Sequence, residues 1–223
     1  MKTIKVAIVI PAFNESETIK AVLAGIIAYG TAIVVDDGST DSTGRLAQEA
    51  GAAVVTHEVN RGYDAALASG LARAMAEEFD VAITVDGDGQ HDPSRIESVL
   101  RELKDGADLV VGVRDRFQRV SETLFANVAN VLWGISDPLC GFKGYRLSKL
   151  ESLSSLCTYP SLGTELTIHA ARSSWDIRQV SIATLERQGS SRFGSGLHAN
   201  LLIFRAMIRG IFCRNIFSID ARR

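Results

Sequence analysis

Two acidic turns contain the residues of this sequence whose types and spacing could do chemistry. Asp86, Asp88 and Gln90 stand at alternate positions in one of them. Carboxylate and amide oxygens are hard ligands, so this spacing predicts a site for Mg²⁺ or Mn²⁺. A second acidic run covers residues 36–41 and begins with Asp36 and Asp37. Acids gathered at one place repel each other, so they indicate a cation or hydrogen-bond donors among them.

The elements around these turns predict an α/β fold. Short β-branched apolar runs alternate with longer helical segments, which is typical of a mainly parallel, Rossmann-like sheet with helices on both faces. We expect strands at 6–10, 32–35, 53–55, 81–85 and 109–113, and helices at 16–29, 41–50, 62–79 and from about 92. Pro11 is expected to end the first strand. Both acidic turns then follow strands, at the carboxyl edge of the sheet, where open α/β sheets bind ligands.

The composition excludes several classes of protein. The 223 residues carry a net charge of −2 and a pI near 6.1, which argues against nucleic acid as a partner. No run approaches the roughly 18 apolar residues of a transmembrane helix, and the N-terminus has no signal-peptide pattern. Three distant cysteines fit neither a disulfide framework nor a zinc site. These features predict a cytoplasmic protein.

Glycine motifs that bind phosphate are absent from the sequence. It has neither GxGxxG after the first strand nor GxxxxGK[ST], which disfavours a dinucleotide oxidoreductase or a P-loop NTPase. A bound nucleotide would therefore need a divalent cation on its phosphates. Two other interpretations of the Asp86 turn stay open. One is a calcium loop, although His91 stands where Gly is expected and Pro93 begins a helix inside it. The other is an acidic turn without a ligand.

The ordered set of motifs resembles the inverting family 2 glycosyltransferases with a GT-A fold. Within them it is most similar to the polyprenyl-phosphate (dolichyl-phosphate) mannose and glucose synthases. The resemblance covers roughly residues 4–195, and its segments are 11–15, 36–41, 60–62, 86–93, 137–143 and 187–192. It implies transfer of a hexose from a UDP- or GDP-sugar to a polyprenyl phosphate, with Mg²⁺ or Mn²⁺ as cofactor.

The same resemblance implies roles for individual residues. The nucleoside pocket would be lined by Pro11, Phe13, Glu15 and Asp37. Asp86 would face the ribose, the diphosphate or the metal, and Asp88 and Gln90 would ligate the metal. Arg114 corresponds to the basic residue near the acceptor phosphate. The residues expected to act on the leaving diphosphate are Asp88, Gln90, Arg187 and Arg192. Many members of the group also carry transmembrane helices after the catalytic domain, and this sequence shows none.

The nucleophile decides whether a general base is needed. A sugar hydroxyl needs a carboxylate within hydrogen-bond reach, whereas a lipid phosphate is already an anion at neutral pH. Arg114 and Arg119 could hold such a phosphate, so a lipid-phosphate acceptor is chemically coherent. Asp137 is the best candidate base if one exists, followed by Glu165. Transfer to a soluble or glycan hydroxyl, and a nucleotide-sugar-binding protein without turnover, stay as alternatives.

The second half of the chain is predicted to be an elaboration of the α/β part. We expect helices at 117–133, 165–172 and 197–212 and strands at 141–146 and 177–185. The predicted division is a catalytic domain over 1–196, with a nucleotide-sugar half (1–115) and an acceptor half (116–196), followed by a basic amphipathic helix and tail over 197–223. That segment, chiefly 197–217, is predicted to lie at the cytoplasmic face of a membrane; the alternative is a helix packed on the core or on a second subunit. A homo-oligomer stays open.

Overall fold

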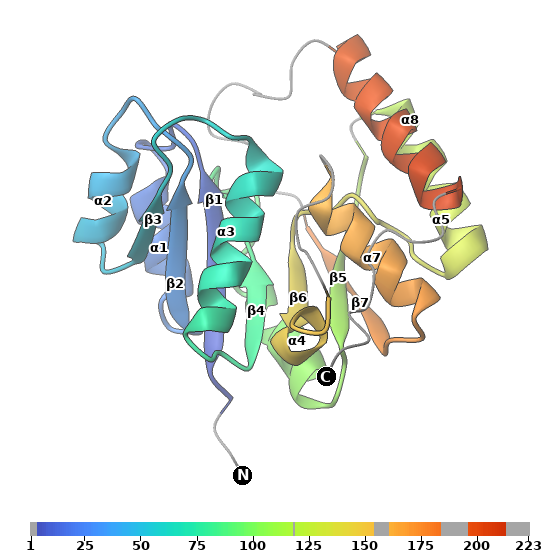
Figure 1. The fold of residues 1–223 in the computed structure, drawn as a ribbon, viewed down its shortest axis with the longest axis horizontal. Coiled ribbons are helices and arrows are strands. Elements are labelled where there is room, and N and C mark those ends of the chain that lie inside the picture. Colours follow the sequence, from blue (N-terminus) through green and yellow to red (C-terminus); the bar gives the residue numbers. More distant parts are fainter. Residues whose placement is uncertain (1–3, 118, 154–160, 184–195, 213–223) are drawn as a thin grey trace.

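A seven-stranded sheet organises the molecule (Figure 1). The computed structural model describes residues 4–117, 119–153, 161–183 and 196–212. The strands are β1 (Val6–Ala12), β2 (Thr31–Asp36), β3 (Ala53–Thr56), β4 (Val81–Thr84), β5 (Leu109–Arg114), β6 (Lys143–Arg146) and β7 (Ile177–Ile182). Their order across the sheet is β3-β2-β1-β4-β6-β5-β7. β6 runs antiparallel to both of its neighbours, and the other pairs are parallel. The predicted α/β class with a mainly parallel sheet is confirmed.

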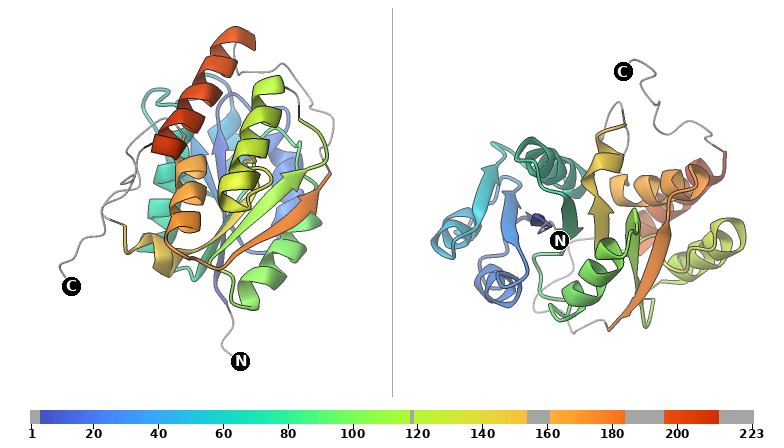
Figure 2. Two further views of the ribbon diagram at one scale, coloured as in Figure 1. Left: turned by 90° about the vertical axis from the view of Figure 1, so that its right-hand side faces the viewer. Right: turned by 90° about the horizontal axis from the view of Figure 1, so that it is seen from below.

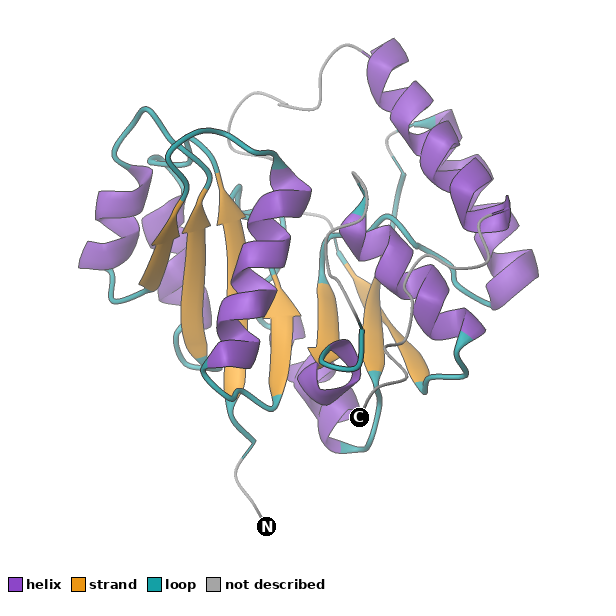
Figure 3. Ribbon diagram, in the orientation of Figure 1, coloured by secondary structure: helices purple, strands orange, loops and turns teal. Residues whose placement is uncertain are grey.

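Helices cover both faces of this sheet, as predicted (Figures 2 and 3). They are α1 (Ile19–Ile26), α2 (Thr43–Glu49), α3 (Tyr63–Ala76), α4 (Arg95–Lys104), α5 (Val120–Trp133), α6 (Leu147–Leu150), α7 (Leu162–Arg172) and α8 (Gly196–Phe212). α1, α2 and α4 share one apolar cluster with the sheet, and α3, α6 and α7 share another. β1 supplies Ile8 and Ile10 to the first cluster and Ala7 and Val9 to the second. Burial on both faces explains why this strand is apolar throughout.

The first strand is longer than its sequence predicts. Pro11 was expected to end it, but β1 continues to Ala12. Pro11 pairs only with Val35 of β2, because the pairing of β1 with β4 ends at Val9 and Thr84. Proline has no N–H to donate to a neighbouring strand, and it is tolerated where that side of the strand is unpaired. The extension brings the chain after β1 directly to the turn after β2.

The last described helix packs on the rest of the chain. Phe125, Ala129, Ile135 and Ile168 form a third apolar cluster, and α8 places Ile203, Ala206 and Met207 against it. α8 lies beside α5 at the edge of the molecule (Figures 1 and 2). The guanidinium of Arg172 also donates to the Ile211 carbonyl at 3.1 Å. The predicted helix is therefore present and rests on α5 and α7, whereas the predicted extension over 213–217 lies outside the described residues.

Candidate functional site

The turns after β1 and β2 are joined by direct hydrogen bonds. The Asp37 N–H donates to the Ala12 carbonyl at 2.8 Å, and the Asn14 N–H donates to the Ser39 hydroxyl at 2.9 Å. The Thr40 N–H donates to Asn14 Oδ1 at 2.8 Å. Asn14 adopts a left-handed backbone conformation with φ 53°, a region that Asn visits more readily than most residues. The segment 11–15 and the acidic run 36–41 therefore form one surface at the carboxyl edge of the sheet.

The turn after β4 belongs to the same surface. The Thr18 hydroxyl lies 2.7 Å from the Gly87 carbonyl oxygen and 3.2 Å from Glu15 Oε2. A Cβ added at Gly87 would lie 3.4 Å from Glu15 Cγ. The structure thus brings Glu15 beside the acidic turn that begins at Asp86, although about seventy residues separate them in the sequence.

Asp86 is partly exposed, with 30% of its side chain accessible, whereas Asp88 on the same turn is buried. Its Oδ1 accepts a hydrogen bond from the Tyr63 hydroxyl at 3.1 Å. His91 Nδ1 accepts the Asp86 N–H at 3.2 Å, which leaves Nε2 to carry the ring proton, 3.6 Å from Asp86 Oδ2. His91 therefore steadies the turn. Tyr63 was not predicted, because nothing in its sequence surroundings distinguishes it.

Asp88 and Gln90 follow on the same turn. Asp88 is buried, and its Oδ1 accepts the Gln90 N–H at 3.1 Å. Within the described residues, no three His, Cys, Asp or Glu side chains are grouped to hold a metal ion by themselves. Mg²⁺ commonly uses one or two carboxylates and completes its shell with water and substrate phosphates. The donor set of Asp86, Asp88 and Gln90 fits such a cation when a diphosphate shares it.

The calcium-loop interpretation does not match this turn. Asp92 Oδ1 accepts the Ser94 N–H at 3.0 Å, and Asp92 Oδ2 accepts the Ser94 hydroxyl at 2.8 Å. Asp92 thus serves the start of α4 instead of facing a shared ligand with Asp86 and Asp88.

Asp37 is held by groups from three separate segments. His57 Nδ1 lies 2.6 Å from Asp37 Oδ1, which also accepts the Arg61 N–H at 2.9 Å. Asp37 Oδ2 accepts the Gly62 N–H at 2.8 Å. On the other side of its ring, His57 Nε2 lies 2.9 Å from the Ser69 hydroxyl. The segment 60–62 was singled out in the sequence, but His57 and Ser69 were assigned no role, since only the fold brings them to Asp37.

Arg114 and Asp137 form a buried ion pair at the end of β5. Asp137 is fully buried, and its carboxylate accepts Arg114 Nε at 2.8 Å, Nη2 at 3.0 Å and the backbone N–H at 3.2 Å. Burial acts to lower the pKa of Arg114, but the hydrogen bonds and charge of Asp137 outweigh it and raise that pKa. These three hydrogen bonds occupy both oxygens of the carboxylate, so the geometry weighs against Asp137 as a general base.

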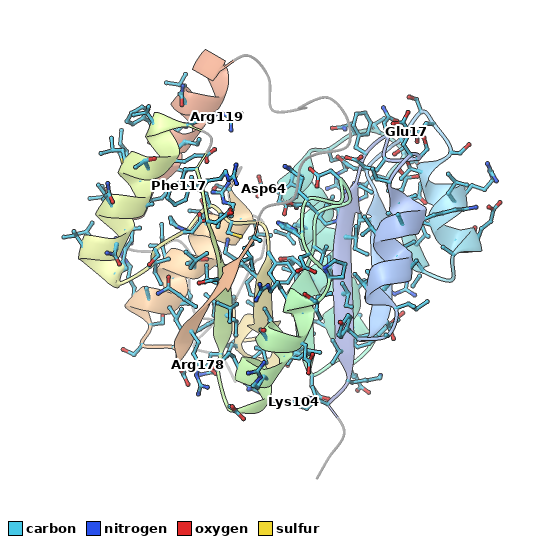
Figure 4. The ribbon with its side chains drawn as sticks, turned by 180° about the vertical axis from the view of Figure 1, so that it is seen from behind. Glu17, Asp64, Lys104, Phe117, Arg119 and Arg178 are labelled. Carbon is cyan, nitrogen blue, oxygen red and sulfur yellow. The ribbon has the colours of Figure 1, made fainter. Side chains whose placement is uncertain are left out.

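A second arginine joins the pair through Glu122. Arg119 Nη1 donates to Glu122 Oε1 at 2.9 Å, and Arg114 Nη1 approaches Glu122 Oε2 at 3.5 Å. Glu122 is buried, and the Arg114 guanidinium lies 5.4 Å from the centre of the Phe117 ring. Figure 4 shows Phe117 and Arg119 near the upper end of the molecule, opposite Lys104 and Arg178. The two arginines predicted for the acceptor side therefore lie together, and Glu122 is an unpredicted member of the group.

Lys143 fixes the loop that carries Asp137. Its ammonium group is buried and donates to the carbonyls of Pro138 (3.1 Å) and Cys140. Burial lowers the pKa of Lys143 and raises the pKa of the Cys140 thiol to about 12, so the thiol is protonated and not a nucleophile at neutral pH. A Cβ added at Gly141 in this loop would lie 2.8 Å from Asp86 Oδ2. The loop 137–143 therefore connects the Arg114 side of the site with the Asp86 side.

For the remaining predicted residues, we give the element in which each one lies. Glu165 is buried in the first turn of α7. Pro11 lies at the end of β1, and Phe13 follows it in the turn. Arg187 and Arg192 lie outside the described residues.

Comparison with known proteins identifies the family. A model described as "Glycosyl transferase family 2" matches residues 7–153. The chain belongs to this family. It is a glycosyltransferase, as the motifs predicted, and the acidic turns just described lie within the matched segment.

Curated relatives with lipid-linked substrates in their names are similar over most of the chain. The dolichyl-phosphate hexose transferase of Haloferax volcanii is 31% identical over 83% of this chain and 85% of its own length. The polyprenol monophosphomannose synthase of Mycolicibacterium smegmatis is 27% identical over 94% of this chain and 88% of its own length.

A solved structure confirms the GT-A type of fold. The glucosyl-3-phosphoglycerate synthase of Mycobacterium tuberculosis, crystallised with Mn²⁺, UDP and phosphoglyceric acid, is 25% identical to this chain with a TM-score of 0.76. The likeness covers 92% of this chain and 78% of that one.

Proposed function

We propose that this glycosyltransferase moves a hexose from a UDP- or GDP-sugar to a polyprenyl phosphate, with Mg²⁺ or Mn²⁺ as cofactor and inversion at the anomeric carbon. One observation carries the proposal. On the acceptor side, the buried acids Asp137 and Glu122 are each bound to an arginine. A nucleophile that is already anionic needs arginines and no base, and a lipid phosphate is such a nucleophile.

The donor would bind at the carboxyl edge of β1, β2 and β4. In this proposal, Pro11, Phe13, Glu15 and Asp37 line the nucleoside pocket. Asp86 faces the ribose and diphosphate and shares the metal with Asp88 and Gln90. When bound, the cation supplies positive charge to the leaving diphosphate. Support comes from the clustering of these turns, from the oxygen donor set, and from the Mn²⁺ and UDP in the mycobacterial neighbour.

The transfer itself is a substitution at the anomeric carbon. An oxygen of the acceptor phosphate forms the new bond to that carbon, and the bond to the diphosphate oxygen breaks with its electron pair leaving on the nucleoside diphosphate. The product is a hexosyl phosphodiester, and no proton needs to move. Arg114 and Arg119 retain N–H groups that can bind the acceptor phosphate. Asp137 keeps Arg114 in place, and Arg187 and Arg192 are proposed to bind the diphosphate.

A metal titration with a matched variant tests the donor side. Wild-type protein, stripped with EDTA and given a radiolabelled nucleotide sugar and a polyprenyl phosphate, should transfer label to the lipid only when Mn²⁺ or Mg²⁺ is restored. Asp88→Asn should lower this turnover by about 100-fold or more, whereas Asp92→Asn, on the same turn but turned toward α4, should change it little. Full activity of Asp88→Asn would contradict the proposed metal role.

Transfer to a soluble hydroxyl is the second candidate. The mycobacterial neighbour was crystallised with phosphoglyceric acid and is named as a glucosyl-3-phosphoglycerate synthase, which favours this alternative. Such an acceptor needs a carboxylate that can take a proton. Glu165 is then the better candidate, because Asp137 is committed to Arg114.

A lipid acceptor also requires contact with a lipid surface, and we propose that α5 and α8 supply it. Their outer faces expose Val120 (87%), Val131 (84%), Leu201 (66%), Phe204 and Ile208. The Ser121 hydroxyl donates to Asn200 Oδ1 and ties the two helices together. Of the helices in the described part of the chain, none has the length and hydropathy to cross a bilayer. Exposed apolar side chains on helices that lie flat can bind at the interface instead.

We propose a catalytic domain over 1–196, with donor and acceptor halves divided near residue 115, and a docking segment over 197–223 at the cytoplasmic face of a membrane.

Vesicle flotation tests this surface. Leu201→Asp with Ile208→Asp should abolish flotation with anionic vesicles. Val59→Asp, which alters a side chain that is 66% exposed in the segment between β3 and α3, should float like the wild type. Equal flotation of all variants would remove the lipid surface from the proposal.

A further inference from the structure

The carboxylate of Asp37 has one acceptor position left. Each carboxylate oxygen offers about two hydrogen-bond positions. Oδ1 receives His57 Nδ1 at 2.6 Å and the Arg61 N–H at 2.9 Å, and Oδ2 receives the Gly62 N–H at 2.8 Å. In the described part of the chain these three are the donors to this side chain. Oδ1 is therefore filled, and Oδ2 can take one more N–H.

His57 is itself fixed in the orientation that fills Oδ1. An ionised carboxylate has no proton to give, so His57 Nδ1 carries the proton of this bond. Nε2 then accepts the hydroxyl proton of Ser69, at 2.9 Å. His57 is buried, with 8% of the residue exposed, and Ser69 belongs to α3, so a helix holds the far side of the ring.

Uracil and guanine differ in what they would offer Asp37. Uracil has a single imide N–H between two carbonyl groups. Guanine has two adjacent donors, the ring N1–H and the exocyclic amine, and a carboxylate binds both only if each oxygen accepts one. Because His57 and Arg61 already fill Oδ1, guanine would leave one buried donor without a partner. An unmade hydrogen bond of this kind rejects a ligand more strongly than a made one attracts it.

We propose that His57 is a positioning residue that sets the base selectivity of the donor site, so that the site accepts a uridine diphosphate sugar and rejects the guanosine equivalent. The proposal rests on the proposed function, because it takes Asp37 to lie in the nucleoside pocket. His57 acts through Asp37 and need not touch the donor. Ser69 supports it by holding the ring.

Direct binding of UDP and GDP in the presence of Mn²⁺, measured by calorimetry, tests this without turnover. Wild-type protein is expected to bind UDP about tenfold or more tightly than GDP. His57→Leu removes the hydrogen bond that positions Asp37, so the affinity for UDP should fall about tenfold. The same change frees Oδ1, so the preference for UDP over GDP should shrink to about threefold or less. His57→Asn can place an amide N–H where Nδ1 stood and should keep the preference. Ser69→Ala should weaken the preference partly.

The binding results distinguish a failure of the proposed role of His57 from a failure of the proposed function. Wild-type protein that binds GDP as tightly as UDP overturns the role of His57 and leaves the proposed function standing. Binding of neither nucleotide overturns the proposed function, and the inference with it. A folded His57→Leu protein, judged by circular dichroism, that keeps the full UDP preference also overturns the inference. If His57→Leu does not fold, the wild-type ratio and the comparison of His57→Asn with Ser69→Ala decide.

Discussion

The ion pair between Asp137 and Arg114 gives a prediction that separates two roles for the acid. Asp137 is fully buried and accepts three hydrogen bonds from Arg114, at 2.8, 3.0 and 3.2 Å. Asp137→Asn keeps the shape of the side chain, removes its charge, and turns one acceptor oxygen into an amide that faces the guanidinium. The variant therefore tests whether the acid serves Arg114 or takes a proton from an acceptor.

The size of the effect follows from the surroundings of Arg114. Removing one partner of a buried ion pair costs about 3–5 kcal/mol. Arg114 retains Glu122 at 3.5 Å and 18% of its side chain is exposed, so Glu122 and water compensate part of the loss. We expect the free energy of unfolding to fall by about 2–4 kcal/mol. Turnover should fall as well, because Arg114 is no longer held.

Urea unfolding of the wild type, Asp137→Asn, Arg114→Met and the double variant measures the pair directly. The double-mutant cycle should give a coupling free energy of about 1–3 kcal/mol. A stability loss under about 1 kcal/mol, unchanged acceptor affinity and abolished turnover would contradict a role of Asp137 in holding Arg114. That pattern would make Asp137 a general base and favour a hydroxyl acceptor.

Two further variants test other parts of the structure. Gly141→Ala should push the Asp86 carboxylate away from a new Cβ, which would lie 2.8 Å from Oδ2. The affinity of Gly141→Ala for the nucleotide with Mn²⁺ should fall about tenfold, with little change in stability. Gly163→Ala is the control, because an added Cβ there meets its first neighbour at 3.7 Å. If Gly141→Ala binds the nucleotide as tightly as the wild type, the contact with Asp86 does not matter for binding. Burial lowers the pKa of His169 below 6.5. As the pH falls, the histidine is therefore protonated in the unfolded chain before it is protonated in the folded protein. Its contribution to stability is present above pH 6.5 and is lost as the pH falls below that value. His169→Gln should make the midpoint of urea unfolding less dependent on pH between about pH 5.5 and 7.5. If the midpoint of the variant changes with pH as steeply as that of the wild type, His169 is not the source of the dependence.

The acidic turns could be predicted from the sequence because the physics of a parallel sheet fixes where they go. Strands of one direction present their carboxyl ends at one edge, so Asp37 and Asp86 had to lie near each other once the strands were recognised. The apolar, β-branched strands 6–10 and 32–35 were recognisable because burial on both faces leaves no polar positions.

The insertion of β6 could not be predicted in the same way. This strand of four residues, Lys143–Arg146, enters between β4 and β5 in the opposite direction. Its local sequence predicts a short strand but holds no information about its neighbours. The insertion carries the loop 137–143 to the site, so the contact of Gly141 with Asp86 depends on it.

The residues that contact the predicted site residues also could not be identified from the sequence. His57 and Asp37 are twenty residues apart, and Arg114 and Asp137 are separated by twenty-three. No periodicity links such positions: the pairing of β3 with β2 brings His57 to Asp37, and the chain that returns after α5 brings Asp137 to Arg114. The sequence motifs and the family resemblance thus singled out Asp37, Arg114 and Asp137, but Asp137 was predicted as a candidate base, whereas the structure buries it against Arg114.

A comparison of three acceptors shows whether the enzyme transfers the hexose to a phosphate or to a hydroxyl group. The full chain, supplied with Mn²⁺ and a labelled UDP- or GDP-hexose, is given a polyprenyl phosphate, the matching polyprenol with a free hydroxyl, or phosphoglyceric acid. Label is expected to move only to the polyprenyl phosphate, giving a phosphodiester that mild acid cleaves, with inverted anomeric configuration. Transfer to the polyprenol or to phosphoglyceric acid at a comparable rate, with none to the lipid phosphate, would contradict the proposed acceptor.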